Sequence, residues 1–315
     1  MKTPLVPIIV ACLSVLKISV LEAQIPQGYS FDSHLVTWVK SNISPATQLP
    51  YSFFIPEQHK SNIYQQMNQA GQVNGAIERS ITASGLDIYD GAVYQIILSM
   101  LGGEDDLKQA QIPFHYYWNG SIGNLDSVRS GYPINLFIYD AKNPQIVSSN
   151  NKLLGQRGFI FRIINADGDF LLTDPMDGQK NVSGFPEYDR LHWVDWKPVA
   201  GENAWVVIAA MQMYHHQHFD KGLKRYRLES SSVELRLSEE LARAAIVLQS
   251  EIGGIRMAPI GTHRNLTDEE KKYFTDTNWW YSHISTENNI SWYAAFRMLY
   301  EVTGKKEYQK AVETG

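Results

Sequence analysis

The sequence predicts a mostly helical fold made of stacked helical hairpins, in which a buried helix is followed by an amphipathic one. Three segments are apolar on nearly every face, which is typical of buried helices. Amphipathic patterns accompany them, and long loops separate one pair from the next. Such pairs cannot bury their faces alone, so they stack side by side, and closing the stack into a ring leaves no edges. We therefore expect a toroid of hairpins, complete or incomplete.

The N-terminal part precedes the first buried helix. Residues 24–57 are predicted to be irregular with a short amphipathic helix, and a helical pattern follows over about 61–83. The first buried helix is expected over 88–101, and Gly102 and Gly103 stop it.

The middle of the chain, about 112–198, is the least helical part. Apolar alternation in 134–139 and in 159–164 allows strands, and 165–169 is typical of a hairpin turn. We expect an irregular or β-containing insertion that shapes a cleft, within a single domain that covers 24–315.

Helical patterns return in the last third. A second buried helix runs from Glu202 through Met213, and an amphipathic one follows over 237–248 with Ser238 as a predicted cap. A third buried helix is expected over 285–302, with an amphipathic partner over 307–313.

The N-terminus predicts export. Lys2 is followed by an apolar stretch over 5–21 and then by Ala23 before a proline, the order of a secretory signal covering 1–23. A membrane anchor is disfavoured because prolines and Lys17 interrupt the stretch, so we expect no stable membrane span after cleavage. Lipid attachment at Cys12 is the other alternative, although the apolar run continues beyond it. The mature protein is expected to be secreted or periplasmic, without any cysteine.

Composition narrows the class of partner. The net charge is −5 and the sequence has no basic stripe, which disfavours nucleic acid. Eight Trp and 17 Tyr are enough to supply flat platforms for sugar rings as well as core. A carbohydrate is therefore the partner that we expect.

No metal and no cofactor are expected. His215, His216 and His218 lie near the end of the second buried helix, where only two of them share a face. Asp167 and Asp169 belong to a short turn that lacks the remaining ligands of a calcium loop.

An acidic residue stands at the start of each buried helix: Asp90, Glu202 and Glu287. Taken singly, each is a helix cap, because a carboxylate in the first turn is worth about 0.3–1 kcal/mol. In a ring of helices that point the same way, however, the three first turns crowd one mouth. Cleavage of a glycosidic bond needs one protonated carboxyl and one carboxylate, so these three residues are the candidate catalysts.

Further side chains near the acids are candidates for substrate binding. Asparagines after Glu287 can bind hydroxyl groups, aromatic rings can stack on sugars, and Asp195 lies between two tryptophans. The predicted set is Asp195, Trp205, His283, Asn288 and Trp292.

A family resemblance strengthens this interpretation. It rests on short runs, Ile88-Tyr89-Asp90, Gly201-Glu202-Asn203-Ala204-Trp205, Gly253-Gly254-Ile255 and Ser285-Thr286-Glu287-Asn288-Asn289-Ile290. The sequence over about 61–315 resembles the six-hairpin glycosidase superfamily, the (α/α)6 toroids. The resemblance implies an inner ring of helices, a sugar-binding cleft at their mouth and catalytic acids there. The superfamily also contains lyases and epimerases, so the fold does not determine the reaction.

Three functional hypotheses follow. The first is an exported glycoside hydrolase that acts on a poly- or oligosaccharide. The second is a lyase or epimerase, for which His283 or Tyr281 would supply the base. The third is a non-catalytic carbohydrate-binding or scaffold protein in which the acids only cap helices.

Overall fold

Helices dominate the residues that the computed structural model describes, as the sequence predicts, and these residues also form three small two-stranded sheets. The predicted signal over 1–23, Asp195 and most of the helical pattern over 61–83 lie outside the residues that the structure describes. The described residues are 33–59, 61–62, 65, 82–119, 138–140, 143–147, 158–160, 162–167, 198–259 and 279–314.

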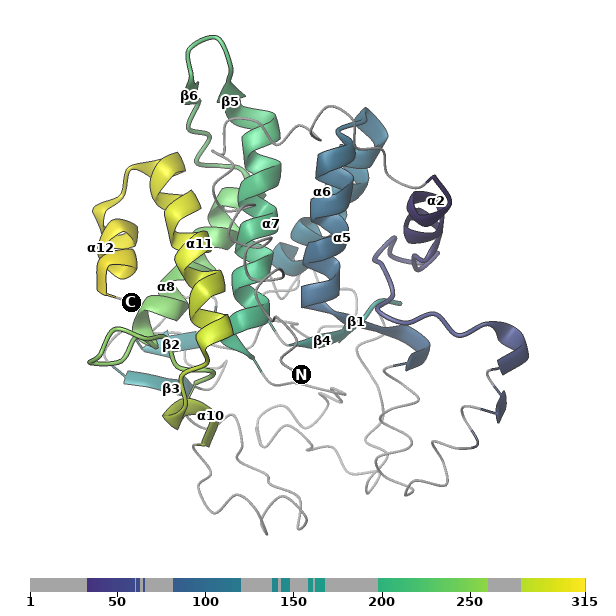
Figure 1. Cartoon of the computed structure of the whole chain (residues 1–315), viewed down its shortest axis with the longest axis horizontal. Coiled ribbons are helices and arrows are strands. Elements are labelled where there is room, and N and C mark those ends of the chain that lie inside the picture. Colours follow the sequence, from purple (N-terminus) through teal and green to yellow (C-terminus); the bar gives the residue numbers. More distant parts are fainter. Residues whose placement is uncertain are drawn as a thin grey trace, which may run out of the picture.

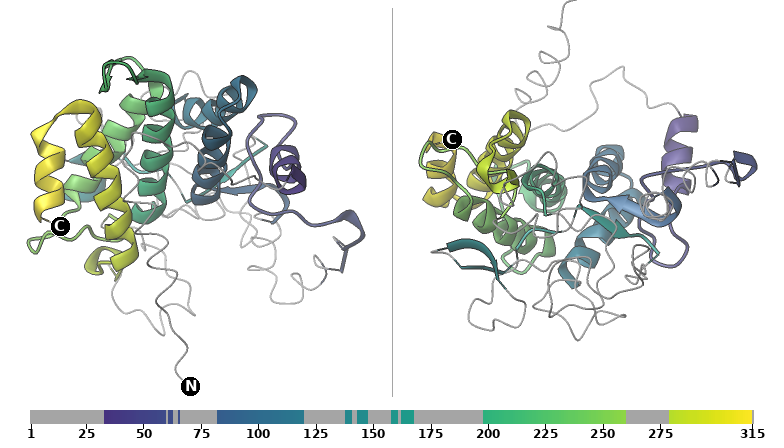
Figure 2. Two further views of the ribbon diagram at one scale, coloured as in Figure 1. Left: turned by 45° about the horizontal axis from the view of Figure 1, so that its top comes forward. Right: turned by 90° about the horizontal axis from the view of Figure 1, so that it is seen from below.

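Three helical hairpins form the body of the protein. They are α5 (Ile88–Leu101) with α6 (Glu104–Asn119), α7 (Ala200–His218) with α8 (Val233–Val247), and α11 (Thr286–Thr303) with α12 (Lys306–Thr314). Helix α7 packs between α5 and α11, while α6 and α8 touch each other behind them. Figure 1 shows α5, α7 and α11 side by side with their first turns at the same end. The two further views show the two layers of helices (Figure 2).

Local sequence explains where these helices begin and end. The side chain of Asp87 caps α5 by accepting from the backbone N–H of Tyr89 at 3.0 Å, and Ser285 caps α11. Gly102 and Gly304 end the two helices with φ of 71° and 68°, a conformation that favours glycine.

Two helical predictions need correction. Helix α8 begins at Val233 with Ser232 as its cap, so Ser238 is a buried residue inside the helix. Helix α6 continues through Pro113 to Asn119, so the non-helical middle starts later than residue 112. The buried residues of α6 recur at helical spacing, and this burial outweighs the proline; they are Ala110, Phe114, Tyr117 and Trp118.

The middle of the chain contains strands, as predicted. Strand β4 (Ile163–Asn165) pairs antiparallel with β1 (Gly85–Asp87), so that Asp87 lies opposite Ile163. Strands β2 (Ile138–Asp140) and β3 (Asn143–Val147) form a second sheet. The β1–β4 pair lies at the start of α5 and fixes the backbone next to Arg162 there.

The remaining elements lie outside the hairpin body. They are α2 (Ser33–Ser41), α10 (Trp279–Ser282) and the short hairpin of β5 (Phe219–Asp220) and β6 (Arg225–Tyr226). Helix α2 is the short N-terminal helix that the sequence predicts. Within the described part of the chain, no helix is long and apolar enough to cross a membrane.

The segments that link one hairpin to the next repeat the same contacts. The side-chain amide of Asn203 accepts from Ile160 N at 2.8 Å and donates to Ile160 O at 3.0 Å. The amide of Asn289 does the same with Ile255, at 2.7 and 3.0 Å. Each asparagine also donates to the carbonyl four residues before it, Val199 or Ser285. Both helices are thus tied to their linking segment in the same way.

The same linking segments also contact the preceding buried helix. Ile88 N donates to Arg162 O at 3.0 Å, and Ala200 N donates to Met257 O at 2.8 Å. Arg162 follows Ile160 by two residues, and Met257 follows Ile255 by two residues. Since each isoleucine is bound by an asparagine amide, which we call the asparagine clamp, Arg162 and Met257 occupy equivalent positions. The hairpins are therefore structural repeats, although their sequences differ.

Candidate functional site

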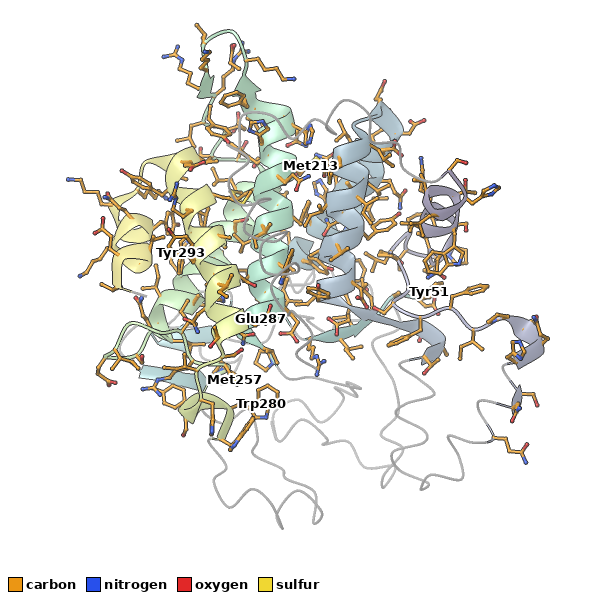
Figure 3. The ribbon with its side chains drawn as sticks, viewed as in Figure 1. Tyr51, Met213, Met257, Trp280, Glu287 and Tyr293 are labelled. Atoms are coloured by element: carbon orange, nitrogen blue, oxygen red, sulfur yellow. The ribbon has the colours of Figure 1, made fainter. Side chains whose placement is uncertain are left out.

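The first turns of the three buried helices are joined by side-chain contacts. The rings of Tyr89 on α5 and Trp205 on α7 meet edge to face, with centroids 5.3 Å apart and an interplanar angle of 85°. The indole N–H of Trp205 lies 3.5 Å from Oε1 of Glu287 on α11. Figure 3 shows Glu287 at the beginning of α11. The end of the helix row where the acids are predicted to gather is thus one connected surface.

Glu287 is exposed and receives neutral donors. Its Oε1 accepts from the hydroxyl of Ser291 at 3.2 Å as well as from Trp205. Its Oε2 lies close to the backbone of Gly201, where an added Cβ would come within 3.2 Å of it. The same Cβ would overlap the amide of Asn288 and lie 2.8 Å from its Cγ. Glycine at position 201 therefore lets the first turns of α7 and α11 approach each other closely.

Glu202 has a cation as its neighbour. Its Oε1 lies 3.1 Å from Nε of Arg162, and the same Nε lies 3.6 Å from Oδ2 of Asp87. The arginine side chain is 37% exposed, and each carboxylate side chain is 17% exposed. One guanidinium thus bridges the cap of α5 and the first turn of α7.

Asp90 lies at the same end but outside this network. It is partly exposed in the first turn of α5 and forms no hydrogen bond or ion pair with a described side chain. Burial raises the pKa of the neighbouring Tyr117 phenol, and the charges of Asp87, Tyr116 and Asp90 add to this effect. The structure therefore brings Glu287 into contact with Trp205 of the aromatic pair and Glu202 into contact with Arg162. Asp90 takes part in neither contact.

The predicted substrate-binding residues divide into two groups. Trp205 is partly buried between Tyr89 and Glu287, and His283 is exposed with Nδ1 2.6 Å from Trp279 O. Asn288 is only 5% exposed, and it packs against Gly201.

Trp292 is a correction to the predicted set. It is 1% exposed, donates its indole N–H to Ala200 O at 2.8 Å and stacks on Phe159 at 5.9 Å. Trp292 follows Glu287 by five positions, so its side chain points about 140° away around the helix. Its ring is covered by the core and offers no face to a sugar.

The histidine cluster lies at the opposite end of α7 from the acids. Nδ1 of His215 is 3.0 Å from the Tyr226 hydroxyl, and its ring stacks on Phe219. Burial lowers the pKa of His215 to about 4, with smaller effects from His216 and Lys221. Among the residues that the structure describes, no three His, Cys, Asp or Glu side chains are grouped so that they could hold a metal ion.

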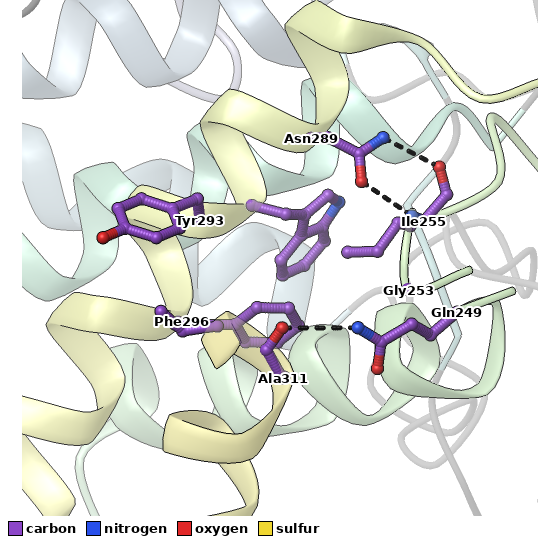
Figure 4. A pocket seen from close by; sticks show the side chains of 9 residues that line it. Gln249, Gly253, Ile255, Asn289, Tyr293, Phe296 and Ala311 are labelled. Carbon is purple, nitrogen blue, oxygen red and sulfur yellow. Dashed lines mark hydrogen bonds between the residues drawn. The ribbon is translucent and has the colours of Figure 1, made fainter. Parts of the chain in front are cut away.

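A small hollow lies on the other side of α11. Its volume is about 20 Å³, room for about one water molecule. Asn289 and Tyr293 border it from the side of α11 opposite Glu287, and Gln249 and Phe296 contribute to its wall (Figure 4). It is too small for a sugar and separate from the acids.

The sequence-based set lacks four residues of the site: Tyr89, Arg162, Asp87 and Ser291. The sequence does mark Arg162 as a candidate site residue, because it is the one charged residue in the apolar run from Phe159 to Ile164. Ser291 follows Glu287 by one helical turn, where a contact is expected.

Comparisons with protein-family models, with curated proteins and with solved structures found no match for this chain.

Proposed function

We propose that this protein is an exported glycoside hydrolase that cleaves a poly- or oligosaccharide with the carboxyl groups of Glu202 and Glu287. The observation that carries the proposal is the meeting of these two helix starts around an aromatic pair at an exposed surface. A set of unrelated helix caps would not require contacts between the caps of different helices.

The two carboxyl groups have different surroundings, as the reaction requires. Glu202 lies beside the guanidinium of Arg162, whereas Glu287 accepts from an indole N–H and a hydroxyl. Glycosidic cleavage needs one carboxyl that gives a proton to the leaving oxygen and one carboxylate that acts as base or nucleophile. Unequal surroundings are how a protein divides these roles between two acids.

The aromatic pair is the proposed sugar platform. Tyr89 is 40% exposed and lies next to Asp90, and its ring contacts Trp205, which in turn reaches Glu287. An exposed ring beside a carboxyl group suits a sugar, whose C–H face stacks on the ring while its hydroxyls bind the acids.

The architecture that we propose is an (α/α) toroid of the six-hairpin type. The repeated clamps of Asn203 and Asn289 on their linking segments support it, because each adds a hairpin to the row in the same way. The row of α5, α7 and α11 then forms part of the inner ring, with the acids at its mouth.

The test is a product analysis. The mature protein and its Glu287→Gln and Glu202→Gln variants are incubated with a panel of glycans, with Glu301→Gln at the far end of α11 as the matched control. We expect new reducing ends with wild type and with Glu301→Gln, and a loss of at least about 100-fold in the two site variants.

Two other outcomes would replace the proposal. Unsaturated product ends would indicate a lyase, and His283 would then be the first base to test. Binding of a glycan without cleavage by any form of the protein would indicate a binding protein.

A further inference from the structure

We propose that Arg162 is a positioning residue that keeps Glu202 ionised, so that Glu202 acts as the carboxylate in the reaction. The catalytic meaning of this inference rests on the proposed function. Its physical content, the effect of the Arg162 charge on the ionisation of Glu202, can be measured without any substrate.

The backbone holds Arg162 in place from both sides. Its carbonyl accepts from Ile88 N at 3.0 Å, and the next residue, Ile163, pairs with Asp87 in the β1–β4 sheet. The guanidinium therefore reaches Glu202 from a fixed point, and Nε lies 3.1 Å from the carboxylate. An opposite charge at this distance favours the ionised form of the acid.

The acidic neighbours make this cation necessary. Asp87 at the start of α5 shares the Arg162 guanidinium with Glu202, and Glu287 approaches the first turn of α7 from α11. Each of these negative charges favours the protonated form of Glu202, and Arg162 opposes them. Of the two candidate catalysts, Glu202 is therefore the one that lies beside a cation.

The repeat argues against a purely structural role for the side chain. Met257 takes the equivalent place in the next linking segment and accepts the same backbone hydrogen bond, from Ala200 N. The fold therefore accommodates an uncharged side chain at this position. The linking segment carries a positive charge at Arg162, which lies next to the carboxylates of Asp87 and Glu202. The equivalent position in the next linking segment, Met257, carries none.

The experiment is an NMR titration of glutamate side-chain carboxyl carbons labelled with ¹³C, with Glu202→Gln used to assign the Glu202 signal. Wild type is compared with Arg162→Met, which installs the residue of the equivalent position, and with Arg162→Lys. Arg256→Met is the matched control, because that arginine also lies in a linking segment but pairs with Glu251 instead.

In wild type we expect the titration midpoint of Glu202 to lie below the ordinary value for a glutamate side chain. Arg162→Met raises the Glu202 midpoint by about one pH unit, Arg162→Lys raises it by less, and Arg256→Met leaves it unchanged. A Glu202 midpoint above the ordinary glutamate value in wild type overturns the inference, whether or not the variants fold. An unmoved Glu202 midpoint in a folded Arg162→Met protein overturns it as well.

Activity is read separately. If a glycan is cleaved, Arg162→Lys moves the acidic limb of the pH–rate profile upward, which a loss of packing alone would not do. If the midpoint of Glu202 moves as expected but no glycan is cleaved, the role of Arg162 stands and the proposed hydrolase function fails.

Discussion

Substitution of Gly201 by alanine tests how closely the first turns of α7 and α11 approach. The new methyl group would lie 2.8 Å from Cγ of Asn288 and 3.2 Å from Oε2 of Glu287, and it would overlap the Asn288 amide oxygen. Overpacking of this kind costs about 2 kcal/mol. Alanine in a helix gains about 1 kcal/mol over glycine, so the net loss of stability is about 1 kcal/mol.

The double variant gives the sharper result. Asn288→Ala removes the two nearest atoms, so in that background Gly201→Ala meets only the oxygen of a flexible glutamate. The helix-propensity gain then dominates, and we expect Gly201→Ala to stabilise the protein by about 0.5 kcal/mol. The midpoints of urea unfolding for the four proteins of the cycle, followed by circular dichroism, measure both effects. The same sign for Gly201→Ala in both backgrounds would refute the close approach of the two helix starts.

Three further predictions concern the clamps, the buried histidine and the aromatic platform. Asn203→Ala lowers the free energy of unfolding by about 3 kcal/mol, because it leaves the backbone groups of Ile160 unpaired in the core. Asn289→Ala lowers it by about half as much, because water can reach the partly buried site of Asn289. Equal urea midpoints for the two variants would contradict this prediction. Burial lowers the pKa of His215 from 6.5 in the unfolded chain to about 4 in the folded protein. The full stability is therefore present above pH 6.5, and the free energy of unfolding falls by about 3 kcal/mol as the pH drops to 4. His215→Gln removes this part of the pH dependence, which urea titrations at several pH values would detect. Tyr89→Ala weakens glycan binding about tenfold in isothermal titration calorimetry, whereas Tyr293→Ala, another exposed tyrosine on the far side of α11, leaves it unchanged.

The helices that the sequence predicts well are those whose signals are local. Helices α5 and α11 end at glycines, the cap of α11 is Ser285, and an apolar run needs no distant partner to be recognised. No helical prediction covers the second half of helix α6, where Pro113 stands within an apolar spacing of helical period. The meeting of Glu287 with Trp205 follows from one topological argument, that inner helices of stacked hairpins run in the same direction.

Arg162 could not be placed from the sequence, although its charge within an apolar run marks it as unusual. Its contact with Asp87 depends on the register of β1 against β4, two three-residue strands that are far apart in the chain. Strands this short carry too little pattern for their pairing to be predicted. The charge environment of Glu202 is therefore a property of tertiary structure.

The polar residues next to the acids show most clearly what a sequence motif conceals. Asn288 and Asn289 were expected to bind hydroxyl groups because they adjoin Glu287. The amide of Asn289 instead makes three hydrogen bonds to backbone groups of Ile255 and Ser285, and Asn203, next to Glu202, does the same in the preceding repeat. Each step along a helix turns the side chain by about 100°, so Asn203 points about 100° from Glu202 and Asn289 points about 200° from Glu287. One first turn can therefore direct an acid toward the surface and an amide toward the linking segment. Each of these first turns thus combines a candidate catalyst with a fixing point for the hairpin that carries it, and the asparagine contacts hold that carboxyl group at a set position in the row of buried helices.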